Sequence, residues 1–194
     1  DLGWAYNDVT STETSFTVHN QGSDVLYLNI SVDDSSFIVE PEYSISANSE
    51  VSIPVSFSPF EVGVNTGILS ITTNTETAFS IELTGESISP PVLDTSSDFL
   101  FFNLDQNSVE TEEISISNTG GSEMTFSLSN SDLSQLSFEP AGDTLQAGES
   151  SSIVVTFASD SLAPGDYTGS IIINSNDPVD AQDIVSVQAH INGI

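Results

Sequence analysis

Three aspartates lie close together near the C-terminal end of the sequence, at Asp177, Asp180 and Asp183. Carboxylate oxygens on turns are hard ligands of the kind that Ca²⁺ prefers in proteins. A second acidic pair, Asp33 and Asp34, is expected in a loop. Neither group follows the ligand spacing of an EF-hand, so a solvated acidic loop is the competing interpretation. The sequence therefore offers Asp177, Asp180 and Asp183 as a weak candidate Ca²⁺ site and predicts no other cofactor.

The residues needed for catalysis are scarce. The chain has two histidines, His19 and His190, and no cysteine. A hydrolytic triad needs a nucleophile, a base and an orienting acid that converge, and no G-x-S-x-G sequence is present. Two facing carboxylates would serve a glycosidase, but among 29 acidic residues such pairs arise by chance. We predict no catalytic residues and no enzyme.

The charge of the chain excludes two classes of partner. It has 29 Asp and Glu residues, no Lys or Arg, and a formal net charge of -29. Phosphate backbones are bound by cationic side chains, so nucleic acid is excluded as a partner. An anionic membrane surface is excluded for the same reason. Only 15% of the residues are charged and apolar residues alternate regularly, so we expect a folded chain rather than an acidic disordered one.

Aromatic residues gather at the start of each half of the sequence. Trp4 and Tyr6 lie in the expected first strand of the first half, and Phe99, Phe101 and Phe102 lie in that of the second. Exposed aromatic side chains would suit a sugar-binding platform. Because the aromatic residues occupy matching positions, we expect them to pack in the core, and we keep the platform as the alternative.

Short alternating segments extend along the whole chain, and no segment of ten or more residues has helical periodicity. Clear examples are residues 14–20, 51–57, 67–73 and 78–83, separated by Asn, Gly, Ser, Asp and Pro. This spacing indicates an all-β sandwich or barrel. The expected core residues are Phe16, Val18, Ile53, Val55, Phe57, Ile114, Ile116, Ile153, Val155 and Phe157. His19 is out of phase with Phe16 and Val18, so we expect it to face solvent.

The second half of the sequence repeats the first. The matched segments are NQG (20–22) with NTG (118–120), FIVEP (37–41) with LSFEP (136–140), 46–58 with 146–158, and 63–74 with 165–176. We therefore predict two copies of one domain, 1–88 and 89–194. The last strand of the first copy is expected at 79–83, ending near Thr84 and Gly85. Pro90 and Pro91 then form a short, stiff linker that joins the domains end to end.

The N-x-G segments are expected at turns. Gly22 and Gly120 would adopt positive φ, while Asn20 and Asn118 would bond local backbone groups. The Glu-Pro pairs at 40–41 and 139–140 are expected to end strands, because proline cannot donate to a β-ladder.

These motifs resemble the ASH-type domain, the branch of immunoglobulin sandwiches that is similar to major sperm protein and to the choice-of-anchor D repeats of large bacterial surface proteins. NSNDP at 174–178 is especially typical, whereas TTNTET at 72–77 in the first copy lacks the Asp-Pro. The resemblance covers nearly the whole chain. It implies two tandem immunoglobulin-like β-sandwiches, a role in assembly or adhesion, and no active site.

The expected function is a non-catalytic extracellular structural module, either a spacer or a self-assembling filament or surface-layer subunit. The alternative is an adhesion module that binds a protein or a glycan through its loops. Its partners would be other copies of itself or neighbouring domains of a larger surface protein, outside the cell or at its surface. Because Asp1 is not an initiator Met, we expect a processed or excised piece whose anchor or export signal lies elsewhere.

Overall fold

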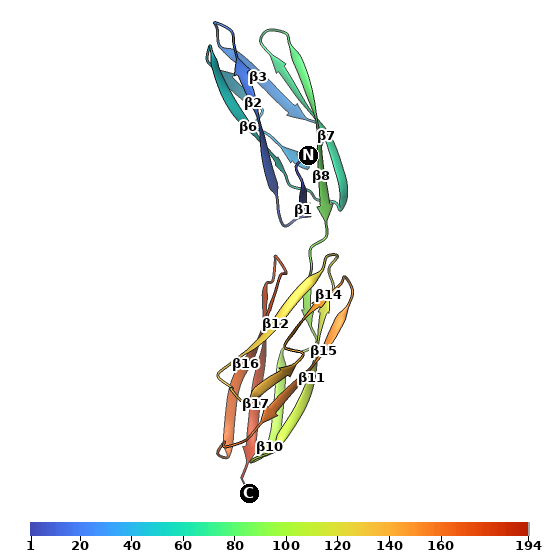
Figure 1. Cartoon of the computed structure of the whole chain (residues 1–194), viewed down its shortest axis with the longest axis vertical. Coiled ribbons are helices and arrows are strands. Elements are labelled where there is room, and N and C mark those ends of the chain that lie inside the picture. The colour runs from blue at the N-terminus through green and yellow to red at the C-terminus, as the bar shows by residue number, and fades with distance from the viewer. Residues whose placement is uncertain (194) are drawn as a thin grey trace. The chain divides into compact units, whose positions relative to one another are not determined.

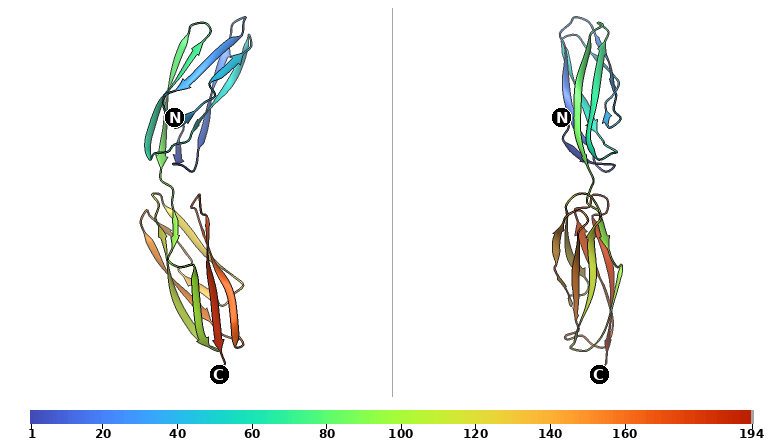
Figure 2. Two further views of the ribbon diagram at one scale, coloured as in Figure 1. Left: turned by 180° about the vertical axis from the view of Figure 1, so that it is seen from behind. Right: turned by 90° about the vertical axis from the view of Figure 1, so that its right-hand side faces the viewer.

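The computed structural model describes residues 1–193 of the chain (Figure 1). They form two compact units: unit 1, Asp1–Ser89, and unit 2, which begins at Pro90. The regular elements of both units are β-strands, and residues 1–193 contain no helix long and apolar enough to cross a membrane. The predicted all-β sandwich fold is confirmed, and Figure 2 shows the strands of each unit in two facing layers.

Unit 1 is a sandwich of a larger and a smaller sheet. Its strands are β1 (Trp4–Tyr6), β2 (Thr12–Asn20), β3 (Leu26–Val32), β4 (Phe37–Ile38), β5 (Glu42–Ile45), β6 (Ser49–Phe57), β7 (Gly63–Thr73) and β8 (Ala78–Ile88). The larger sheet has the strand order β1-β8-β7-β3-β5 and the smaller one β2-β6-β4. Within residues 1–193, strand β2 pairs with β6 alone, so its other side is an edge of the smaller sheet.

Unit 2 has the same plan with one more strand. Its strands are β9 (Leu93–Thr95), β10 (Phe99–Asp105), β11 (Val109–Asn118), β12 (Met124–Ser131), β13 (Leu136–Glu139), β14 (Gly142–Leu145), β15 (Ser150–Ala158), β16 (Gly165–Ser175) and β17 (Gln182–Asn192). The larger sheet has the order β10-β17-β16-β12-β14 and the smaller one β13-β15-β11-β9. The additional strand β9 covers the edge of β11, the counterpart of β2.

The predicted core lies between the two sheets of each unit, because alternate residues of a strand point to the same face. The predicted core residues that are buried are Ile53, Val55, Phe57, Ile114, Ile116, Ile153, Val155 and Phe157. Phe16 and Val18 pack against the core of unit 1 but are only half-buried. The sequence placed these two residues on the correct face and did not reveal that the face is incompletely covered.

Each core contains one stacked aromatic pair, in which Phe57 and Phe157 are equivalent but their partner rings come from different strands. In unit 1 the rings of Phe37 and Phe57 stack with centroids 5.2 Å apart. In unit 2 the rings of Phe102 and Phe157 stack with centroids 5.5 Å apart. Offset stacking adds to the stabilisation that comes from burying the rings.

The last strand of unit 1 is longer than the sequence predicted. Strand β8 does not end near Thr84 and Gly85 but continues to Ile88, because β7 pairs with it as far as Ser87 and β1 pairs with its final residues in parallel register, Trp4 opposite Glu86 and Tyr6 opposite Ile88. Alternation within one segment does not show how far its partner strands extend, and the predicted strand was therefore too short.

The prediction of positive φ for Gly22 and Gly120 was wrong. The glycines with positive φ are Gly3, Gly63, Gly148 and Gly165. Gly120 is instead required by a close approach: a Cβ atom there would lie 2.2 Å from the carbonyl oxygen of Pro90. Glycine at this position lets the backbone before β9 pass directly over the turn after β11.

Candidate functional site

Asp177 is a buried structural anchor in unit 2. Asp177 is only 3% exposed. The backbone amides of Val179 and Asp180 donate to its Oδ1 at 2.8 and 3.1 Å, which closes the turn before β17. The amide of Leu93 donates to its Oδ2 at 2.9 Å. One carboxylate therefore holds both its own loop and the start of β9.

The protonation of Asp177 follows from these contacts. Burial raises the pKa of its carboxyl, but the backbone N–H donors of Leu93, Asp180 and Val179 together lower it by more, so the pKa lies below its ordinary value of 3.8. A group whose pKa is lowered by folding stabilises the native state in its ionised form. This contribution to unit 2 is present above pH 3.8 and is lost as the pH falls through the lowered pKa.

The other two candidate ligands have separate roles. The Asp183 carboxylate accepts a hydrogen bond from the Thr95 hydroxyl of β9 and another from the amide of Ile184. Asp180 contributes its backbone amide to the Asp177 turn. Residues 1–193 contain no group of three or more His, Asp or Glu side chains placed to hold a metal ion. The Ca²⁺ assignment gains no support from this geometry and stays a prediction.

Asn20 and Asn118 connect distant parts of their sandwiches. The predicted local bonds exist, since the amide of Gly120 donates to Asn118 Oδ1 at 3.1 Å and that of Gly22 to Asn20 Oδ1 at 3.0 Å. The side-chain amides also reach across the fold. Asn118 Nδ2 donates to the carbonyl of Leu145 at 3.2 Å, and Asn20 Nδ2 donates to that of Ile45 at 2.9 Å. The asparagine of each N-x-G segment therefore forms a buried link to a distant strand in addition to its bond within the turn.

The first residues of unit 2, residues 90–93, are fixed to the rest of that unit by several hydrogen bonds. The amide of Gly121 donates to the carbonyl of Pro90 at 2.9 Å, and the amide of Thr119 donates to that of Val92 at 2.9 Å. The amide of Val92 in turn donates to Asn118 Oδ1 at 3.3 Å. Together with the bond from Leu93 to Asp177, these contacts hold residues 90–93 along their whole length. We call this set of contacts the linker clamp.

Both histidines form exposed pairs with acidic residues on the neighbouring strand. His19 Nδ1 lies 2.8 Å from Glu50 Oε2, and His190 Nδ1 lies 2.7 Å from Asp166 Oδ1. Each pair joins directly opposed residues of antiparallel strands. The prediction that His19 faces solvent is confirmed. We interpret both histidine–carboxylate pairs as cross-strand contacts. Such contacts contribute little to stability when they are exposed.

The aromatic residues expected in the first strand of each half lie in β1 of unit 1 and in β10, which is the second strand of unit 2, and most of them are exposed. Phe102 is fully buried, as expected. Trp4, Phe99 and Phe101 are between 46% and 54% exposed, and the prediction of core packing was wrong for them. Alternation explains Phe99 and Phe101, because β10 turns Leu100 and Phe102 inward and its other face is uncovered. These exposed rings keep the platform alternative open.

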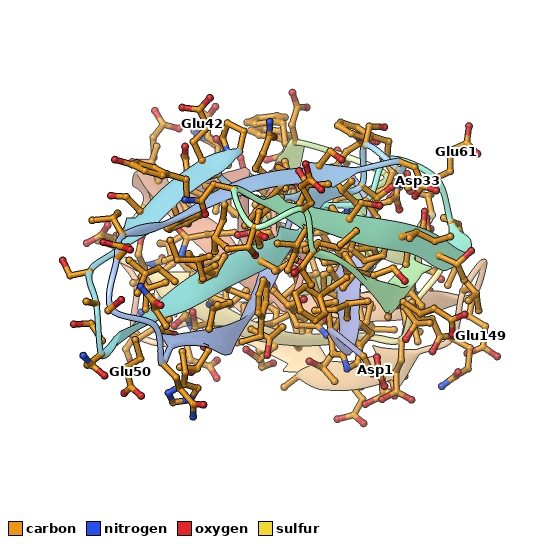
Figure 3. The ribbon with its side chains drawn as sticks, turned by 90° about the horizontal axis from the view of Figure 1, so that it is seen from above. Asp1, Asp33, Glu42, Glu50, Glu61 and Glu149 are labelled. Atoms are coloured by element: carbon orange, nitrogen blue, oxygen red, sulfur yellow. The ribbon has the colours of Figure 1, made fainter. Side chains whose placement is uncertain are left out.

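An open hollow of about 620 Å³ lies on unit 1, beside β3, β5 and β7. Its lining includes Tyr27, Tyr43 and Asn74, with Glu42 as the one carboxylate. A glycosidase needs two carboxyl groups that face each other across the bond to be broken. The hollow therefore lacks the acid–base pair that this chemistry requires. In Figure 3 the labelled carboxylates Glu42, Glu50 and Glu61 lie at the periphery, while the carboxylate of Asp33 accepts a hydrogen bond from the amide of Ile68 at 2.7 Å.

Comparison with known protein families agrees with this fold. Residues 91–190 match the family model described as HYDIN/CFA65/VesB-like, Ig-like domain, which confirms the expected immunoglobulin-type sandwich. No curated protein matches the sequence.

Several solved structures are similar to the chain at low sequence identity. One is a protein of unknown function from Porphyromonas gingivalis W83, with 14% identity, a TM-score of 0.44, and coverage of 93% of this chain and 91% of that one. Another is the ASH/PapD-like domain 7 of human CEP192, with 11% identity, a TM-score of 0.43, and coverage of 53% and 84%. A third is WR4, an MSP family member of C. elegans, with 13% identity, a TM-score of 0.37, and coverage of 52% and 97%.

Proposed function

Because the chain belongs to the HYDIN/CFA65/VesB-like family of Ig-like domains, we propose that it is a non-catalytic structural module. Its specific role is that of a spacer, which separates neighbouring parts of a larger extracellular or cell-surface protein. The module acts through its two folded units and their connection, and it uses no cofactor.

The linker clamp is the observation that supports this role. On the side of unit 1, β8 stays paired up to Ile88, whose carbonyl accepts a hydrogen bond from the amide of Asn7 at 3.1 Å. On the side of unit 2, the clamp begins at Pro90. These two stretches are one residue apart in the sequence, and the proline rings fix φ at Pro90 and Pro91. A connection with so few unrestrained torsions suits a spacer better than a flexible tether would.

The placement of polar groups supports the same proposal. The candidate ligand Asp177 and the buried amides Asn20 and Asn118 all bond to the backbone of their own unit. Groups that hold loops in this way are not available to a substrate. The net charge of -29 favours solubility and opposes close packing of copies.

Sedimentation velocity of the chain separates a spacer from a self-assembling subunit. Near 0.15 M salt, where repulsion between exposed charges is screened beyond about 8 Å, we expect one species whose sedimentation coefficient does not change with protein concentration. Species whose sedimentation coefficient increases with protein concentration would indicate a self-assembling filament or surface-layer subunit instead of a spacer.

An adhesion module is the second candidate, and the exposed rings of Phe99 and Phe101 favour it. Aromatic faces at the surface are suited to sugars and to protein partners. A glycan or protein ligand that loses affinity when both are replaced by serine would support this function over the spacer.

A further inference from the structure

The hollow on unit 1 lies on the larger sheet, at the end opposite β1. Its volume is about 620 Å³, and its lining consists of residues 27–29 of β3, residues 42–44 of β5 and residues 72–74 at the end of β7. The middle strand β3 pairs with β5 on one side and with β7 on the other. The backbone groups of β3 are therefore engaged in two ladders, and the hollow offers a ligand mainly side chains.

Four exposed side chains of the hollow form two pairs across β3 and β5. Tyr27 lies opposite Ser44, and Asn29 lies opposite Glu42. Tyr27 is 58% exposed, so much of its ring is accessible. Residues two apart on a strand lie on one face about 7 Å from each other, so the two pairs are neighbours. Among residues 1–193, none of these four side chains has a hydrogen-bond partner.

An exposed aromatic ring beside amide, carboxylate and hydroxyl groups suits a sugar. The faces of a pyranose ring carry C–H groups, which pack against an aromatic ring. Its hydroxyls both donate and accept hydrogen bonds. The carboxylate of Glu42 supplies acceptors for them, and the side-chain amide of Asn29 supplies donors and an acceptor. The volume of the hollow also falls within the range of about 300–1,000 Å³ that is usual for small-ligand sites.

The charge of the hollow favours an uncharged sugar. The chain has no Lys or Arg, and the lining of the hollow contains Glu42. An acidic sugar would find no cationic side chain to pair with and would be repelled by this carboxylate. A divalent cation needs more oxygen ligands than one carboxylate provides. The electrostatics therefore select a neutral ligand that is recognised by stacking and by hydrogen bonds.

Unit 2 has the same three strands with smaller side chains at these positions. By strand register, the replacements are Thr125 for Tyr27, Ser127 for Asn29 and Gly142 for Glu42. A larger residue at Gly142 is not accommodated, since a Cβ atom there would lie 2.7 Å from the carbonyl oxygen of Phe126. The corresponding hollow of unit 2 is smaller, about 360 Å³. The two units thus share a fold and differ in the groups that a sugar would contact.

We propose that the hollow of unit 1 binds a neutral hexopyranose unit of a glycan. The sugar ring stacks on Tyr27, and its hydroxyls form hydrogen bonds with Asn29, Glu42 and Ser44. This binding function goes beyond the spacer role and does not depend on it. The site is also separate from the exposed rings of β10, which belong to unit 2.

Saturation-transfer difference NMR tests the binding with neutral oligosaccharides of glucose, galactose, mannose and N-acetylglucosamine. We expect transfer from the chain to the ring C–H protons of at least one of these sugars, because the protons lie against Tyr27 in the complex. In amide spectra of the isotope-labelled chain, the same sugar should shift signals of β3 and β5. Oligosaccharides of glucuronic acid are the charge control and should show no transfer.

Tyr27→Thr gives the decisive variant, because unit 2 has threonine at this position. The residue is largely exposed and threonine is favoured in strands, so we expect the variant to fold. Loss of the stacking ring should weaken sugar binding roughly tenfold. Phe79→Thr is the matched control, since Phe79 lies in the same unit outside the hollow and is likewise 58% exposed. It should leave binding unchanged.

Four results would each overturn the proposal. They are no transfer to any of the neutral sugars, stronger transfer to the glucuronic acid oligosaccharides, unchanged binding by a folded Tyr27→Thr variant, and loss of binding in Phe79→Thr. None of them bears on the spacer role, which rests on the linker clamp and is tested by separate measurements.

Discussion

Replacing Phe157 by alanine is expected to lower the free energy of unfolding of unit 2 by about 3–5 kcal/mol. The ring of Phe157 has no exposed surface and stacks on Phe102 at the centre of the core. Its removal leaves a cavity between two sheets whose backbones are fixed by their ladders, so little collapse can compensate. Phe57→Ala is expected to have a similar effect on unit 1, where Phe57 stacks on Phe37.

The single tryptophan allows the two units to be followed separately. Trp4 lies in unit 1, so its fluorescence during urea unfolding reports on unit 1, whereas far-ultraviolet circular dichroism reports on both units. Phe157→Ala should shift part of the dichroism transition to lower urea and leave the Trp4 transition in place. Phe101→Ala, at an exposed ring, should change neither. An equal shift of both signals in Phe157→Ala would contradict independent folding of the two units.

Replacing Asn118 by alanine is expected to destabilise unit 2 by roughly 2–4 kcal/mol, since each buried polar group left without a partner costs about 1–3 kcal/mol. Asn118 has no exposed surface, and its amide donates to the carbonyls of Ser122 and Leu145. Its Oδ1 accepts from Gly120 and Val92. Alanine removes every one of these bonds and releases part of the linker clamp.

Asn118→Asp separates the two halves of this interaction. Aspartate keeps the acceptor toward Gly120 and Val92 but cannot donate to Ser122 and Leu145, so we expect it to destabilise unit 2 as well. Asn29→Ala, on the exposed face of β3, is the control and should stay within about 0.5 kcal/mol of the parent chain. Chemical denaturation followed by circular dichroism measures all three. A loss below 0.5 kcal/mol in Asn118→Ala would show that the buried amide is not a cross-link.

The core of both units could be predicted because alternation determines which residues share a face. The choice of Ile53, Val55 and Phe57, and of their repeats in unit 2, needed only the period of a strand and the internal repeat. The same reasoning placed His19 at the surface. These residues are buried by the facing sheet of their own unit. The repeated pattern already implied that each unit has such a second sheet.

What alternation cannot show is whether a face is covered. Phe99 and Phe101 lie on the outer face of β10, and Phe16 lies beside an open edge of unit 1. Each follows the pattern of a core residue, yet none is fully buried. Their exposure depends on which strands lie alongside, and that depends on pairings between residues far apart in the chain.

The role of Asp177 was also beyond the sequence pattern. The cluster with Asp180 and Asp183 suggested ligands, whereas Asp177 binds the amide of Leu93, which lies 84 positions earlier. One signal was present in the repeat itself. The first copy lacks the Asp-Pro of NSNDP, so this aspartate is not part of the pattern that the two copies share.

The distance between labels on the two units tests the spacer most directly. The chain has no cysteine, so Thr17→Cys in β2 and Ser129→Cys in β12, both exposed, give two unique sites for spin labels. Pulsed electron paramagnetic resonance should give one narrow distance distribution, which a Gly-Ser-Gly-Ser insertion between Ser89 and Pro90 broadens. A distribution in the parent chain as broad as that of the insertion variant would contradict the proposal that the linker clamp makes this chain a spacer.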